Sequence, residues 1–288
     1  MDKQIIFLVT LLVTLGVFGY TTRRFIGYFR QTQKGFPIKQ LGRRFGVMME
    51  VAIGQTKIFR RPVMGLLHAL VFWGFCVILI GSIEMVIDGL FGTERALSFL
   101  GGFYNFIMAS GDIFALVIAI AIIVFLFRRL FLNVKRFSGI EMKHISHLDA
   151  NIALTMILLL MISLLGMNTF YVLETAAKGH EQAGIYPVSK LLASLFNAGS
   201  STHFWHEFNW WLHIGLIFVF ANYLPYSKHF HVFMSVPNVF LSRLDPLGKL
   251  DTMESITREV KIMMDPDQAC ASPPQGEGVE EEAPERFG

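Results

Sequence analysis

Residues 62–83 read PVMGLLHALVFWGFCVILIGSI, a run that contains no Asp, Glu, Lys or Arg. A helix that crosses the hydrocarbon core of a bilayer needs about 20 mostly apolar residues. The run meets this length, and His68 is the one histidine within it. We therefore expect a transmembrane helix that carries a histidine inside the membrane.

Four other segments share this character, so we expect an all-α membrane protein built as a five-transmembrane-helix bundle. The expected helices cover residues 4–22, 62–88, 102–132, 148–173 and 204–231. None of them alternates polar and apolar residues as a barrel strand would. The composition agrees, since 53% of the residues are hydrophobic and only 16% are charged, whereas soluble domains have about 25% charged residues. The net charge of +3 gives no sign of nucleic-acid binding.

The basic residues of the loops predict how the bundle lies in the membrane. Lys and Arg are abundant in residues 23–61, 128–143 and 228–249, and they are rare in residues 89–101 and 174–203. The positive-inside rule therefore puts the N-terminus outside and the C-terminus in the cytoplasm. We expect a multi-pass protein of the inner (cytoplasmic) membrane.

Three parts are expected along the chain. Residues 1–240 form the five-helix transmembrane domain, and residues 241–265 form a cytoplasmic amphipathic segment. In that segment Asp251 and Glu254 resemble a capping box that opens a short helix. Residues 266–288 are mostly Pro, Gly, Ala and Glu, a composition that buries too little apolar surface to fold. We expect them to form a disordered acidic linker or tail.

Histidines inside the membrane are the strongest sign of function, because ionisable groups there are costly. His213 lies in the last expected helix, and His231 follows it by eighteen residues, which is five whole turns at 100° per residue. The two therefore share a face if the helix continues past Pro225. Facing histidines in an apolar bundle are typical of b-type haem, whose iron takes two axial imidazoles. We expect His68, His213 and His231 to ligate the iron of one or two haems.

The last expected helix resembles that of the respiratory nitrate reductase gamma subunit. The resemblance rests on His213, Gly215, Pro225-Tyr226-Ser227, His231 and Ser235-Val236-Pro237. It implies a five-helix, dihaem, quinol-oxidising cytochrome b with its N-terminus outside. It is weak along the rest of the bundle, except in the segment that begins at residue 62.

The resemblance also implies a ligand set. His213 matches a ligand of the outer haem, while His231 and His68 match the two ligands of the inner haem. The remaining ligand position is Ile78 here, and isoleucine cannot ligate iron. The outer haem is then absent, five-coordinate on His213, or completed from another helix. Spacing along the helices also leaves a single haem on His68 and His213 open, beside the pairing of His68 with His231.

A narrower resemblance concerns the cytoplasmic side. Leu224 to His229, Pro237 to Val239 and the tail from Pro284 to Gly288 resemble bacterial membrane-bound iron–sulfur oxidoreductases. These include the heterodisulfide reductase membrane subunit and electron-transfer-flavoprotein:menaquinone oxidoreductases. The resemblance implies a cytoplasmic iron–sulfur protein as partner, either a separate subunit or a C-terminal module missing from this chain. Cys76 and Cys270 are too few to hold a cysteine-ligated cluster.

Quinone chemistry moves protons, so a titratable group must reach the headgroup. Asp112 is the one carboxylate inside the third expected helix, and His206 lies seven residues before His213 on the same helical face. Both are candidates for a quinone site, although Asp112 could equally pair with a neighbouring helix. We expect Glu84 and Asp88 to be solvated acids at the outer edge.

These observations favour an electron-transfer subunit of a quinone oxidoreductase complex. It would be a membrane cytochrome b that transfers electrons between a cytoplasmic iron–sulfur oxidoreductase and the menaquinone pool through bis-histidine b haem. The alternative is a haem-free protein, either a proton-coupled transporter or a membrane anchor or scaffold. We expect the remaining histidines to be bystanders: His144, His147, His180, His203 and His229.

Overall fold

The computed structural model describes residues 2–31, 38–132, 144–245, 248 and 253–264. The chain consists of two compact units, Met1–Ser242 and Arg243–Gly288. Within the described residues the regular elements are all helices, in agreement with the expected all-α class.

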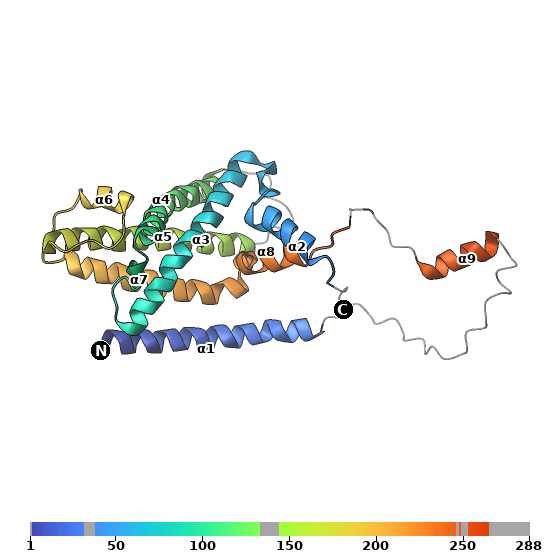
Figure 1. The fold of residues 1–288 in the computed structure, drawn as a ribbon, viewed down its shortest axis with the longest axis horizontal. Coiled ribbons are helices and arrows are strands. Elements are labelled where there is room, and N and C mark those ends of the chain that lie inside the picture. The colour runs from blue at the N-terminus through green and yellow to red at the C-terminus, as the bar shows by residue number, and fades with distance from the viewer. Residues whose placement is uncertain (1, 32–37, 133–143, 246–247, 249–252, 265–288) are drawn as a thin grey trace. The chain divides into compact units, whose positions relative to one another are not determined.

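Five long helices make up most of the first unit, whose arrangement is drawn in Figure 1. They are α1 (Asp2–Gln31), α3 (Pro62–Phe91), α4 (Gly102–Phe131), α5 (His144–Lys178) and α7 (Thr202–Tyr223). Each packs against the next long helix along the chain, and α7 also packs against α1, so the five helices close into a ring. Polar side chains that point into this ring are enclosed by helix on every side.

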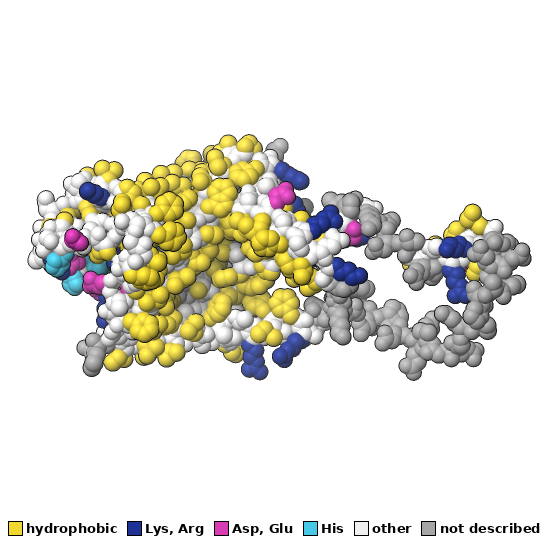
Figure 2. Space-filling view, in the orientation of Figure 1, with side chains coloured by type: hydrophobic (Ala, Val, Ile, Leu, Met, Phe, Trp, Pro, Cys, Tyr) yellow, Lys and Arg dark blue, Asp and Glu magenta, His cyan; other side chains and the backbone are white. Residues whose placement is uncertain are grey.

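Four of these helices, α1, α3, α4 and α5, are long and apolar enough to cross a membrane, which makes this a membrane protein. Apolar side chains cover the middle of the bundle, and most charged side chains lie toward its two ends (Figure 2). The fifth, α7, has 22 residues and carries polar side chains such as Glu207 and Asn209. It is not among the helices that qualify by composition. A fifth span and the orientation in the membrane therefore remain predictions.

The bundle has two distinct ends. At the N-terminal end, α1 and α7 begin, α3 and α5 finish, and two short helices lie in the connections, η3 (Ser98–Leu100) and α6 (Pro187–Ala193). At the basic end, α4 finishes in Arg128 and Arg129. The short helices that follow α1 and α7 along the chain belong to this end: α2 (Leu41–Met48), η1 (Met49–Ile53), η2 (Ile58–Arg60), η5 (Leu224–Tyr226), η6 (Lys228–Phe230) and α8 (His231–Phe240).

Two of the observed helices, α1 and α5, are much longer than expected at their charged ends. The first helix continues to Gln31 instead of residue 22, and α5 covers His144–Lys178 instead of 148–173. The expected limits follow the apolar run, which ends where the bilayer core ends. Backbone hydrogen bonds do not need an apolar side chain, so each helix runs on into the polar layer.

The expected single helix over 204–231 is wrong. The helix α7 ends at Tyr223, Pro225 lies in η5, and Ser227 is extended, with φ −96° and ψ 155°. A proline inside a helix removes a backbone donor and crowds the preceding turn, so the helix breaks there. The five-turn argument consequently fails, because His213 and His231 lie on different helices.

A buried arginine holds the basic end together. Arg44 on α2 donates from Nη1 to the carbonyls of Phe240 and Ser242, at 3.0 and 2.8 Å, and from Nε to the carbonyl of Lys39 at 2.9 Å. These bonds tie α2 to the end of α8. Because these bonds fix the end of α8, they also hold its first residue, His231, in position.

The second unit contains α9 (Glu254–Met264), in the place of the helix expected in the segment 241–265. Ile256, Val260 and Met263 are exposed apolar side chains on this helix. Asp251 and the tail 266–288 lie outside the described residues.

Gly65 gives a test of the packing of α3 against η2. A Cβ at this position would lie 2.4 Å from the carbonyl oxygen of Ile58, a backbone atom that cannot rotate away. We expect Gly65→Ala to lower the free energy of unfolding by about 1–3 kcal/mol, as overpacking does. The readout is the thermal unfolding midpoint in detergent. Gly16→Ala is the control, since a Cβ there meets nothing within 4 Å; an equal midpoint for Gly65→Ala and the parent would contradict the packing.

Candidate functional site

Two of the expected ligands meet at the basic end. His68 lies on the second turn of α3, and His231 is the first residue of α8. Their ring centroids are 6.2 Å apart, with an angle of 30° between the ring planes. The break after Tyr223 makes this approach possible, because it frees α8 from the axis of α7. Of the two pairings that the sequence leaves open, the structure brings together His68 and His231.

Each ring of this pair has a nitrogen that can ligate a metal ion. The Nδ1 of His231 lies 3.1 Å from the carbonyl of Lys228, so Nδ1–H donates there and the lone pair is on Nε2. The Nδ1 of His68 is buried and has no hydrogen-bond partner among the residues that the structure describes. An imidazole that ligates a metal usually donates its other ring N–H to a carbonyl or carboxylate, as His231 does.

The spacing of the two rings fits one shared metal ion. An imidazole nitrogen lies about 2 Å from its metal, and the ring centre lies about 1 Å farther on the same line. Two imidazoles on opposite sides of one ion therefore have centroids about 6 Å apart. If the rings point nitrogen toward nitrogen, the same spacing leaves the nearest nitrogens about 4 Å apart, too far for a direct hydrogen bond.

A third imidazole lies beside this pair. The ring centroid of His229 is 5.9 Å from that of His231, and its Nδ1 lies 3.1 Å from the Ser227 hydroxyl. Burial, and then the neighbouring His231, lower the pKa of His229, so it stays neutral at pH 7. A continuous helix would point His229 about 200° away from His231, and the break after Tyr223 brings the two rings close together instead.

His213 lies deeper in the bundle, on α7, with 1% of its surface exposed. Its Nδ1 is 3.0 Å from the carbonyl of Leu160 and 3.0 Å from the hydroxyl of Ser163, both on α5. The ring is thus oriented from one side, and Nε2 carries the lone pair. This arrangement also suits an iron ligand, so the second ligand must come from the opposite side.

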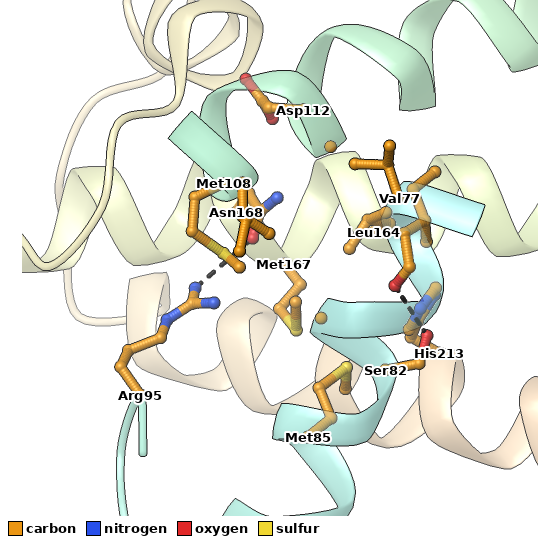
Figure 3. A pocket seen from close by; sticks show the side chains of 14 residues that line it. Val77, Ser82, Met85, Arg95, Met108, Asp112, Leu164, Met167, Asn168 and His213 are labelled. Atoms are coloured by element: carbon orange, nitrogen blue, oxygen red, sulfur yellow. Dashed lines mark hydrogen bonds between the residues drawn. The ribbon is translucent and has the colours of Figure 1, made fainter. Parts of the chain in front are cut away.

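The cavity beside His213 does not supply a second iron ligand. It has a volume of about 40 Å³, room for a few water molecules and far too small for a porphyrin. Ile78 lines the same cavity, so the position that the resemblance assigns to the missing ligand does face His213 but offers only hydrocarbon. Figure 3 shows the cavity, whose lining includes three thioethers: Met85, Met108 and Met167.

Asp112 is not the isolated carboxylate that one interpretation of the sequence expects. It accepts hydrogen bonds from the backbone N–H groups of Val188 and Ser189 at 2.8 and 2.9 Å, and from the Ser189 hydroxyl at 2.5 Å. The carboxylate caps the start of α6 and is 1% exposed. The alternative expectation, a pairing with a neighbouring helix, is the correct one, and Asp112 and His206 line different cavities.

Glu84 and Asp88 are not solvated acids. Glu84 is 1% exposed and accepts from the Leu97 backbone and the Tyr104 hydroxyl. Asp88 accepts from the side chain of Thr93 and from backbone N–H groups after it. Together the two carboxylates fold the connection between α3 and α4 back onto the bundle, where it would otherwise extend into water.

That connection delivers a residue that sequence reasoning missed. Arg95, with the positive φ of 58°, turns inward and lies 4.0 Å from Glu84, 3.4 Å from the Asn168 amide oxygen and over the ring of Tyr171 at 4.4 Å. Its side chain lines both the His213 cavity and a second pocket. The sequence signal for Arg95 was that it is the one basic residue of its loop. The positive-inside rule counts such a residue only as a charge, so this signal was not used.

The second pocket, here called the N-terminal pocket, has a volume of about 190 Å³. Helices α1, α3, α5 and α7 and the α3–α4 connection all contribute to it. Its polar lining includes Arg95, His206 and the Lys3–Glu207 ion pair, and its apolar lining includes Tyr171 and Trp210. His206 therefore lines a pocket large enough for a ring-shaped ligand, and its role in a quinone site stays a prediction.

Comparison with known proteins gives two distant relatives. The chain is 26% identical over 266 residues to the probable iron-sulfur-binding oxidoreductase FadF of Bacillus subtilis, covering 90% of this chain and 35% of FadF. It is also 26% identical over 203 residues to the EtfAB:quinone oxidoreductase of Syntrophomonas wolfei, covering 68% of this chain and 27% of that protein. The chain thus spans about a third of the length of these relatives, or less.

No protein-family model and no solved structure matches the chain. The two relatives agree with the expected likeness to membrane-bound iron–sulfur and electron-transfer-flavoprotein oxidoreductases. The likeness to the nitrate reductase gamma subunit stays a prediction.

Ser189 tests the role of Asp112 as a structural cap. Replacing it by Ala removes one donor from a buried carboxylate, and we expect a loss of about 1–3 kcal/mol in the free energy of unfolding. The thermal unfolding midpoint in detergent measures this. Ser194→Ala is the matched control, because Ser194 follows α6 directly, is exposed and donates to the Leu191 carbonyl. If Ser189→Ala and Ser194→Ala had the same midpoint, Asp112 would not depend on this bond.

Proposed function

We propose that this chain is a membrane cytochrome b that transfers electrons between a cytoplasmic iron–sulfur oxidoreductase and the menaquinone pool. The observation that carries the proposal is the pair His68 and His231, with rings 6.2 Å apart and nitrogens left for a metal. The two relatives, which are named as an iron-sulfur-binding oxidoreductase and a quinone oxidoreductase, support the same class of activity.

The alternative for His68 and His231 is a purely structural role, in which both histidines hydrogen-bond to the protein and bind no metal. A buried imidazole nitrogen without a partner costs free energy, and the burial is tolerated when a ligand completes the site. The Nδ1 of His68 is such an atom among the described residues. An iron bound at the Nδ1 of His68 and the Nε2 of His231 would satisfy both rings, a reason that a haem-free transporter or scaffold lacks. Haem at this pair would supply reversible one-electron chemistry.

The position of the pair suits exchange with a cytoplasmic partner. His231 is exposed at the basic end, close to the positively charged residues that the positive-inside rule assigns to the cytoplasm. Lys228 is exposed beside it. A basic face steers an acidic partner and speeds its association. The iron–sulfur protein of the proposal would dock here and exchange electrons with the pair.

We assign the quinone to the N-terminal pocket. Arg95 and His206 offer donors to the headgroup oxygens, and Tyr171 and Trp210 offer flat apolar surface. His206 would also exchange the proton that quinone chemistry requires. The pair of His68 and His231 lies at the basic end of the bundle, opposite this pocket, so electrons need an intermediate redox group between the pocket and the pair. His213 lies between them, seven residues or about 10 Å along α7 from His206. A haem count of two per chain would require the helices around His213 to open for the second haem, because the cavity beside His213 is too small for a porphyrin. A count of one would place quinone exchange at the basic end.

Histidine replacements test the inner pair. We expect His68→Ala and His231→Ala each to lose one b-type haem, because a single imidazole with no opposite ligand holds the iron poorly. The measurement is a pyridine haemochrome assay on protein made with haem available. His229→Ala is the control, since it lies beside the pair but bonds to Ser227, and it should keep its haem. If the assay found no haem in the unmodified chain, the result would contradict the proposal and favour the haem-free alternatives.

The quinone assignment is tested by kinetics. We expect Arg95→Gln and His206→Gln to slow haem reduction by a menaquinol analogue at least tenfold, because each loses a donor to the headgroup. Stopped-flow spectroscopy of the purified protein measures the rate. His180→Ala, an exposed loop change, should leave the rate unaltered. Unchanged rates in both pocket variants would move the quinone site elsewhere without affecting the haem assignment.

A further inference from the structure

Three metal-ligating side chains meet at the N-terminal end of the bundle. Glu174 lies near the end of α5, and His203 and His206 lie on the first turns of α7. The carboxylate oxygens of Glu174 are 3.0 Å from the Nδ1 of His203 and 3.7 Å from the Nδ1 of His206. One ligand atom from each of the three residues lies within 4.8 Å of the others.

This donor set is that of a zinc-type site. Two histidine nitrogens and one carboxylate oxygen are common ligands of Zn²⁺, and they leave a fourth position open. A tetrahedral ion with ligands at about 2.0–2.1 Å keeps its ligand atoms a little over 3 Å apart, so the three groups need only a small inward movement. The two histidines are three residues apart on α7 and share a face. Mg²⁺ and Ca²⁺ prefer oxygen ligands and fit poorly.

The competing interpretation is a cluster of surface ion pairs. Lys178 donates to Glu174 Oε1 at 2.6 Å and neutralises it without any metal. Its side chain is 56% exposed, however, and so is free to turn into water, while Glu174 is 13% exposed and fixed in place. Ion pairs of such exposed side chains contribute little, so a divalent ion can displace Lys178 from the carboxylate.

We propose that Glu174, His203 and His206 bind a divalent transition-metal ion of the zinc type at the mouth of the N-terminal pocket. His203 is 69% exposed and gives the ion access from water, while His206 is 17% exposed and faces the pocket. Binding at Nδ1 draws the imidazole of His206 toward Glu174. Given the quinone role proposed for the pocket, bound Zn²⁺ slows electron exchange with the quinol analogue.

Metal binding is measured without reference to haem or quinone. The full chain, purified in detergent with a tag free of histidine, is titrated with Co²⁺ and then with Zn²⁺. We expect visible absorption of tetrahedral Co²⁺ with one ion per chain, and its loss on addition of Zn²⁺. Glu174→Gln and His203→Ala should each weaken Zn²⁺ binding at least tenfold, and Lys178→Gln should strengthen it. His180→Ala is the matched control and should bind as the parent does.

The outcomes separate the two proposals. Because His203 is exposed, its loss does not threaten the fold, so equal Zn²⁺ affinity in His203→Ala and the parent would overturn the metal site. Absence of tetrahedral Co²⁺ absorption would do the same. Zn²⁺ binding that leaves the rate of haem reduction by quinol unchanged would uphold the metal site and count against the quinone assignment alone.

Discussion

A polar group inside a membrane-spanning bundle has no water to bond with, so the chain itself must satisfy it. This constraint explains the buried polar side chains at the N-terminal end. Asp112 is satisfied by the start of α6, Glu84 by Leu97 and Tyr104, and Arg95 by Glu84 and Asn168. The bonds of Asp112 and Glu84 fold connecting segments back over the helices, and Arg95 on one of these segments lines the N-terminal pocket. The Nδ1 of His68 is one of several buried polar atoms that have no hydrogen-bond partner among the described residues, and it is the one that belongs to the histidine pair.

The break after α7 has the largest consequence for function. A continuous helix would carry His231 along the axis of α7, whereas the break at Pro225 lets α8 turn its first residue toward α3. Arg44 then holds the far end of α8 through two backbone carbonyls. The interaction that forms the pair is thus tertiary, and it depends on segments from three parts of the chain. The deeper His213 is positioned differently, by direct hydrogen bonds from α5.

Much of the fold could be predicted from the apolar runs, because length and hydropathy are local properties. The spans that include His68 and Asp112 were placed within a few residues of their observed bounds. The expected fifth helix is too long, because a regular histidine spacing favours a continuous helix and Pro225 breaks it. The partners of Asp112 and the inward turn of Arg95 could not be predicted, because they depend on which loop lies over which helix end. His68 is expected as a ligand because it is a histidine inside an apolar run, and its pairing with His231 is what the resemblance implies; the structure brings these two together.

The most direct test of this account is electron paramagnetic resonance of the oxidised protein, combined with the number of haems per chain. A shared iron between His68 and His231 predicts at least one low-spin ferric haem with the signature of two imidazole ligands. The same signal should disappear in His231→Ala and persist in His229→Ala. A protein that contains no haem, or only high-spin iron, would contradict the claim that these two histidines hold one iron between them.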